Sequence, residues 1–119
     1  MARKRAVSAE TLEQIDSLEA ELTALEVKRR ELAAGGLPTV QSQIDHLSTL
    51  VQIHSHASTI ARLRGDVLTS LKQIDAISKL SNEIHKLQRD LIMDRLNELK
   101  ERADKQGEAA SILAAYHRG

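Results

Sequence analysis

The sequence has no cysteine, phenylalanine or tryptophan, and it has one proline and one tyrosine. Without cysteine the chain has no disulfide framework, no thiolate nucleophile and no cysteine-liganded zinc site. This composition suits a reducing compartment, and we expect a cytoplasmic protein. The absence of Phe and Trp also argues against a small-molecule site, because aromatic side chains usually line such pockets.

Neither sign of charge predominates, because 17 basic residues balance 17 acidic ones. A net charge of zero gives the chain no general attraction to nucleic acid or to anionic membranes. The longest stretch without Asp, Glu, Lys or Arg, residues 46–61, is interrupted by hydroxyl and amide side chains. We therefore expect no membrane span.

Aliphatic and charged residues dominate the composition: 41% of the 119 residues are hydrophobic and 29% are charged. This apolar content is too high for a disordered tail, and the length suits one domain or one helical module. Because proline and aromatic residues are scarce, we predict an all-α fold. The expected architecture is an elongated antiparallel helical hairpin or bundle with coiled-coil character and a long third helix.

A coiled-coil seam predicts the first helix, over residues 8–34. Ser8 is the expected N-cap, and seam residues follow at alternating steps of three and four. Arg29 occupies the one seam position that is not apolar, and we expect its head to extend to the rim of the seam. The seam residues are Ile15, Leu18, Leu22, Leu25, Arg29 and Leu32.

Gly35, Gly36 and Pro38 predict a loop over residues 34–38, because glycine and proline terminate helices. Thr39 is the expected cap of a second helix of nearly equal length, and the two helices should form an antiparallel hairpin over residues 8–64. A parallel homodimer of the first helix is disfavoured, because Glu21 would face Glu26 of the partner helix.

The second helix is almost free of charge, since Asp45 is the single charged residue of residues 35–61. Its polar side chains are hydroxyls, amides and imidazoles, which can be buried at lower cost than charges. We predict that this helix is packed on more than one side; the alternative is an ordinary polar helix face. His54 occupies a position that favours an apolar residue, and it is expected to set the helix register at some cost in stability.

The third helix is predicted over residues 65–106. The apolar series keeps its phase across Gly65, which favours one continuous helix there, although Asp66 could cap a new one. Gln106-Gly107 is the expected end, followed by a short C-terminal helix over residues 108–117. Three charge pairs four residues apart should support the long helix: Asp75 with Lys79, Glu98 with Arg102 and Glu101 with Lys105.

Catalytic and metal-binding patterns are missing, and we predict no enzymatic activity, no cofactor and no metal. Gly35-Gly36 lacks the Lys-Ser/Thr of a phosphate-binding loop, and no nucleophile elbow occurs. His54 and His56 should point to opposite sides of their helix, so they form no ligand set within one chain. Arg64-Gly65-Asp66 matches a tripeptide of adhesion ligands, but its helical flanks favour a chance match.

An acidic row in the third helix, Asp90, Asp94, Glu98 and Glu101, could suggest a carboxylate metal site. Basic residues alternate with it along the sequence, and this favours a solvated mixed-charge face.

The expected function is that of a non-enzymatic helical protein–protein interaction module: a small adaptor, assembly factor or inhibitor. The partner would be another protein, a second copy of the chain, or both, and we expect no membrane and no small-molecule substrate. A narrow helical module can hide little apolar surface, so late apolar residues are the candidate contacts. These residues are Leu91, Ile92, Leu96, Leu99, Ala109, Ile112, Leu113 and Tyr116.

Two alternative functions stay open. Residues 1–7 form a basic arm whose Arg3, Lys4 and Arg5 could contact phosphates in an oligomeric nucleic-acid-binding accessory protein. Such short charge runs more often solubilise a chain, and no second basic helix is present to read bases. The other alternative is a self-assembling structural rod.

Overall fold

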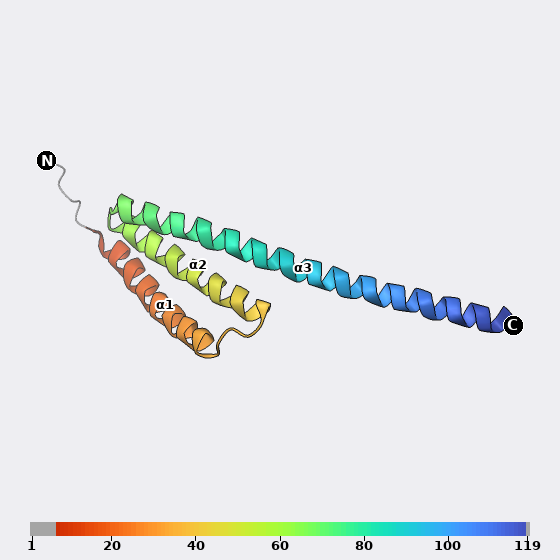
Figure 1. Cartoon of the computed structure of the whole chain (residues 1–119). Coiled ribbons are helices and arrows are strands. Elements are labelled where there is room, and N and C mark those ends of the chain that lie inside the picture. Colours follow the sequence, from red (N-terminus) through yellow and green to blue (C-terminus); the bar gives the residue numbers. More distant parts are fainter. Residues whose placement is uncertain (1–6, 119) are drawn as a thin grey trace. The chain divides into compact units, whose positions relative to one another are not determined.

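The computed structural model describes residues 7–118, with the side chains of residues 117 and 118 excepted. Three helices make up the fold: α1 (Ala9–Ala34), α2 (Val40–Leu63) and α3 (Val67–Arg118) (Figure 1). No strand occurs within residues 7–118, so the all-α prediction is confirmed. The candidate phosphate contacts Arg3, Lys4 and Arg5 lie outside the described residues.

Helix α1 begins as predicted at Ser8, whose Oγ accepts a hydrogen bond from the Thr11 N–H at 3.2 Å. The predicted seam is its inner face: Ile15 is buried, and the other five seam residues are half-buried. Arg29 Nε donates to Glu26 Oε2 at 3.1 Å, and 31% of the Arg29 side chain is exposed. The guanidinium therefore lies at the rim of the seam rather than in the core, as expected.

The connection between α1 and α2 follows the glycine and threonine signals. Gly36 has a φ of 77°, and its N–H donates to the Ala33 carbonyl at 3.0 Å, which ends α1 in a left-handed residue. Thr39 Oγ1 then accepts from the Ser42 N–H, while Ser42 Oγ accepts from the Thr39 N–H, both at 3.0 Å. This reciprocal pair is a capping box that starts α2.

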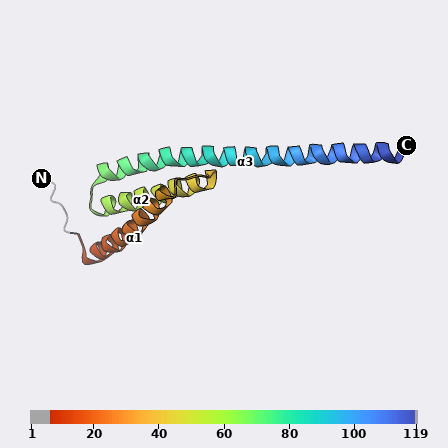
Figure 2. The same ribbon diagram turned by 60° about the horizontal axis from the view of Figure 1, so that its bottom comes forward.

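The chain divides into two units, Met1–Lys86 and Leu87–Gly119. In the first unit α2 lies between α1 and the first part of α3 in both views (Figures 1 and 2). It holds most of the buried residues of that unit, and the prediction that α2 is packed on more than one side is confirmed. The buried residues of α2 are Ile44, Thr49, Ile53, Ser58, Ile60 and Ala61.

The expected continuity of the helix through Gly65 is wrong, because two local signals act together there. Gly65 has a φ of 79°, and its N–H donates to the Arg62 carbonyl at 3.0 Å. The Asp66 N–H donates to the Ala61 carbonyl at 2.8 Å, which completes a Schellman motif. Asp66 Oδ1 then accepts from the Thr69 N–H at 3.1 Å and caps α3. Val67, Leu71 and Ile74 keep the apolar phase but are exposed, so they do not continue the packing of α2. Helix α3 contacts α2 through Ser70 and Gln73 instead.

The expected helix end at Gln106-Gly107, with a separate helix over residues 108–117, is also wrong. Helix α3 runs without a break from Val67 to Arg118. An isolated glycine inside a helix costs only about 1 kcal/mol relative to alanine, and no proline follows it. Gly107 therefore lacks the second signal that Asp66 provides after Gly65.

Of the three predicted charge pairs in α3, the first is formed: Lys79 Nζ lies 3.2 Å from Asp75 Oδ2. Within residues 7–118, Glu98 with Arg102 and Glu101 with Lys105 form no ion pair. Such exposed pairs contribute little to stability, about 0.3–0.5 kcal/mol each. The charges of the second unit are therefore available for other contacts.

The two glycines make a matched test of these assignments. Gly65→Ala should lower the free energy of unfolding by roughly 1–2 kcal/mol, because a Cβ disfavours the left-handed conformation. Gly107→Ala should instead raise helicity and stabilise α3 by up to about 1 kcal/mol, since the space around it is open. Urea unfolding followed by circular dichroism measures both, and effects of the same sign would contradict the assignment.

Candidate functional site

The second unit is formed by the later part of α3, and every residue from Gln88 to Tyr116 is exposed. In the first unit, the α3 residues Ile77, Leu80 and Ile84 are half-buried and share the face of Ser70, which contacts α2. Past Leu87 the apolar residues no longer have such cover. All eight predicted contacts, from Leu91 to Tyr116, belong to this exposed set.

Four apolar residues of this segment form one narrow stripe. At about 100° per residue, Ile92, Leu96, Leu99 and Ala103 point within about 60° of one another around the helix axis. The three large ones are 59%, 51% and 53% exposed. We call these four residues the apolar stripe. Their spacing is that of the a and d positions of a heptad.

The structure separates the other predicted contacts from this stripe. Leu91, Ala109, Ile112 and Tyr116 each lie more than about 100° from its centre, on another side of α3. Leu113 lies between these four residues and the apolar stripe. The eight residues therefore do not form one surface, because the heptad phase shifts between Leu91 and Ile92.

Most charges of this segment are sorted by sign around the helix. Arg89, Arg95, Lys100 and Arg102 each lie within about 90° of the centre of the apolar stripe. The acidic residues lie farther round, on the opposite side; they are Asp90, Asp94, Glu98, Glu101 and Asp104. All are exposed, as predicted. The predicted mixing of charge occurs only on the acidic side, where Lys105 lies, whereas the border of the apolar stripe is basic.

Sequence reasoning missed the four basic residues as part of a site. Along the sequence they alternate with acidic residues and suggest mixing. The signal was present in the angular positions around the helix, where basic residues border the apolar stripe.

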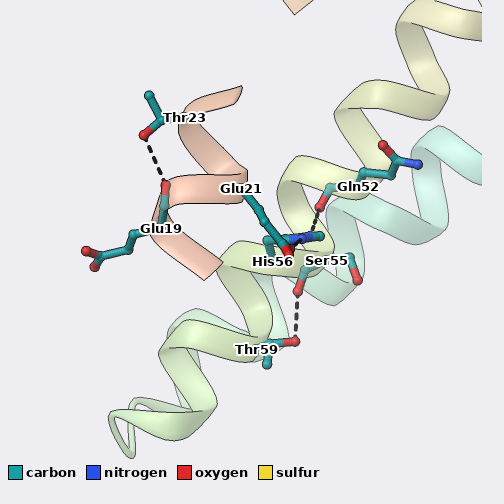
Figure 3. A network of polar contacts seen from close by, with 7 residues as sticks. All are labelled: Glu19, Glu21, Thr23, Gln52, Ser55, His56 and Thr59. Carbon is teal, nitrogen blue, oxygen red and sulfur yellow. Dashed lines mark hydrogen bonds and ion pairs between the residues drawn. The ribbon is translucent and has the colours of Figure 1, made fainter. Parts of the chain in front are cut away.

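In the first unit, polar side chains join α1 to α2 (Figure 3). His56 Nε2 lies 2.7 Å from Glu21 Oε2, and His56 Nδ1 lies 2.9 Å from the Gln52 carbonyl oxygen. Both ring nitrogens thus face acceptors, and the ring makes both hydrogen bonds when both nitrogens carry a proton. Arg64 forms a second ion pair across the helices, with Glu19. These contacts link α1 to α2 at the surface of the hairpin, and the apolar seam provides its core.

A further set of polar side chains joins α2 to α3. Ser58 Oγ and Ser70 Oγ form a buried hydrogen bond of 2.9 Å, and His54 Nδ1 forms a hydrogen bond with Gln73 Oε1. His54 therefore contacts α3 at a defined position, as a register-setting residue would. His46 differs, because its Nε2 is buried without a hydrogen-bond partner in the described part of the chain.

Two surface hollows lie on the first unit, with volumes of about 310 and 270 Å³. Neither is lined by histidine among the described residues. The larger is bordered by Lys28, Leu32, Asp45, Ser48, Thr49 and Gln52. The smaller is bordered by Glu19, Leu22, Ala57, Ile60, Ala61, Arg64, Asp66 and Thr69. Within residues 7–118, no three His, Asp or Glu side chains are grouped so that they could hold a metal ion.

The tripeptide Arg64-Gly65-Asp66 forms the turn between α2 and α3. Arg64 is paired with Glu19, and Asp66 caps α3 through Thr69. Both charged side chains thus have structural roles, which supports the interpretation of the adhesion motif as a chance match.

Comparisons of the chain with protein-family models, with curated proteins and with solved structures found no match. Among the described residues, no helix combines the length and the apolar character that crossing a membrane requires.

Two histidines of α2 provide a test of the core. His54→Leu should lower the free energy of unfolding by about 1 kcal/mol, because Gln73 loses its hydrogen-bond partner. His46→Leu, at a similar volume, should leave stability unchanged or raise it, because it removes a buried nitrogen without a partner. Denaturant titration of both variants measures the difference. A loss of stability in His46→Leu as large as that in His54→Leu would contradict this explanation.

Proposed function

We propose that this chain is a non-enzymatic helical protein–protein interaction module, acting as a small adaptor, assembly factor or inhibitor. One observation carries the proposal. Ile92, Leu96 and Leu99 are more than half exposed at heptad spacing, in a segment where every residue from Gln88 to Tyr116 is exposed.

The first unit has a core of its own, which does not include the apolar stripe. Its core is provided by α1, α2 and the early part of α3, with Ile15 and Ile53 among its buried residues. Monomeric proteins rarely leave large apolar side chains exposed together without a partner. An exposed apolar face on a helix is a common means of binding another helix or a groove.

The energy available from this face limits the kind of complex it forms. Burying one exposed Leu or Ile contributes roughly 1.5–3 kcal/mol. Association costs an estimated 4–15 kcal/mol in lost motion. Three large apolar side chains alone therefore support a modest affinity, and polar contacts at the border of the stripe must contribute as well.

The alternatives stay predictions. The nucleic-acid-binding alternative depends on Arg3, Lys4 and Arg5, which lie outside the described residues. A self-assembling rod would grow in mass with concentration in sedimentation experiments. A cytoplasmic location is likewise a prediction from the composition.

A pair of variants tests the interaction module. The first variant is a triple substitution, Ile92→Ser, Leu96→Ser and Leu99→Ser. It should abolish capture of partner proteins from the native cell. It should leave the unfolding midpoint of the first unit unchanged, since these side chains are exposed. The control, Asp94→Ser with Glu98→Ser and Glu101→Ser, should retain the captured proteins. Quantitative mass spectrometry compares the two, and an identical set of captured proteins for both variants would overturn the proposal.

A further inference from the structure

We propose that the apolar stripe of α3 binds an amphipathic helix of a different protein whose own apolar stripe is bordered by Asp and Glu. This inference rests on the proposed function and names the chemistry of the partner. The acidic partner is inferred because basic residues border the apolar stripe and no acidic residue lies at that border.

Heptad positions define the contacts that such a helix would make. Leu96 and Ala103 occupy a positions, and Ile92 and Leu99 occupy d positions. The bordering e and g positions hold Lys100, Arg95 and Arg102, together with Met93. In a coiled coil these e and g side chains reach across to the partner and select it by charge. In the described part of the chain, Arg95, Lys100 and Arg102 form no ion pair that would have to break first.

A second copy of this chain is disfavoured as the occupant. In a parallel pair, Arg95 of one copy would face Lys100 of the other. In an antiparallel pair that aligns the two stripes, Arg95 of one copy would face Arg102 of the other, and Lys100 would face Met93. Like charges at such positions are destabilising. The apolar stripe of one copy could also dock against the acidic side of another. The positions of Asp90, Asp94, Glu98, Glu101 and Asp104 carry no aliphatic side chains, so such a contact would bury little apolar surface.

A lipid surface is also less suitable than a helix. Helices that lie in a membrane interface usually present a large apolar face with Trp, Phe or Leu. The stripe here spans only about 60° and has no aromatic residue, which is the width of a coiled-coil seam. Electrostatic complementarity with an acidic helix would raise the association rate and favour that partner over basic ones.

Two designed peptides of four heptads provide the test. Both have Ile at a and Leu at d; one has Glu at every e and g position, and the other has Lys. Like charges keep each peptide from pairing with itself. Fluorescence anisotropy measures their binding to the full chain. We expect the Glu peptide to bind at least about tenfold more tightly than the Lys peptide, which corresponds to about 1.4 kcal/mol.

Charge reversal should invert this preference. Arg95→Glu with Lys100→Glu and Arg102→Glu should favour the Lys peptide. The control Arg62→Glu with Lys72→Glu and Lys105→Glu makes the same change in net charge away from the stripe. These three residues are exposed, and the control should still favour the Glu peptide.

The other outcomes would overturn the inference in distinguishable ways. Both peptides could bind the chain equally, and the triple variant Ile92→Ser, Leu96→Ser, Leu99→Ser could lose this binding. That result would refute the acidic partner, but it would still agree with the proposed interaction module. Binding of neither peptide would refute the acidic helix. If the chain then bound vesicles containing phosphatidylserine, or formed a dimer in sedimentation that the same serine variant abolished, a membrane or a second copy would replace that partner.

Discussion

The burial of α2 between two neighbours is the constraint on which the first unit depends. A helix that is covered on two sides leaves little room for charged side chains, because a buried charge must be paired to be tolerated. Asp45 is the single charged residue in residues 35–61, and α2 instead meets its neighbours through hydroxyl, imidazole and amide groups. Ser58 with Ser70 and His54 with Gln73 are the clearest examples. These short polar side chains also let helices approach closely while satisfying their own hydrogen bonds.

The same constraint explains where the covered part of α3 ends. Ile77, Leu80 and Ile84 on the inner face are aliphatic and half-buried, whereas the corresponding side of α3 after Leu91 carries Asp94, Glu98 and Arg102. A charged side cannot be packed in the same way. The apolar residues Ile92, Leu96 and Leu99 lie at another phase, which Val67 and Ile74 share earlier in the helix, and all five are exposed. Only the face of Ile77, Leu80 and Ile84 contributes to the core of the first unit.

Much of this could be read from the sequence. The seam from Ile15 to Leu32, the caps Ser8 and Thr39, and the double-sided packing of α2 follow from spacing and composition. The expectation of a continuous helix at Gly65 fails because the Gly-Asp pair, and not the apolar phase, marks the turn; Val67 and Ile74 keep that phase and are exposed. The expected end at Gly107 fails because one glycine without a following cap does not stop a helix. The apolar residues of the later part of α3 could be predicted as a set, but their division into two sides of α3 and the sorting of charge required angles around the axis.

The apolar stripe and its basic border come from one uninterrupted run of residues within a single helix, whereas the contacts of the hairpin are assembled from segments far apart in the chain. A surface of this kind is portable. Grafted in phase onto an unrelated helix, residues 88–104 would carry their pattern of side chains with them. This end of the chain can therefore be lengthened, shortened or exchanged without redesigning the core of the first unit.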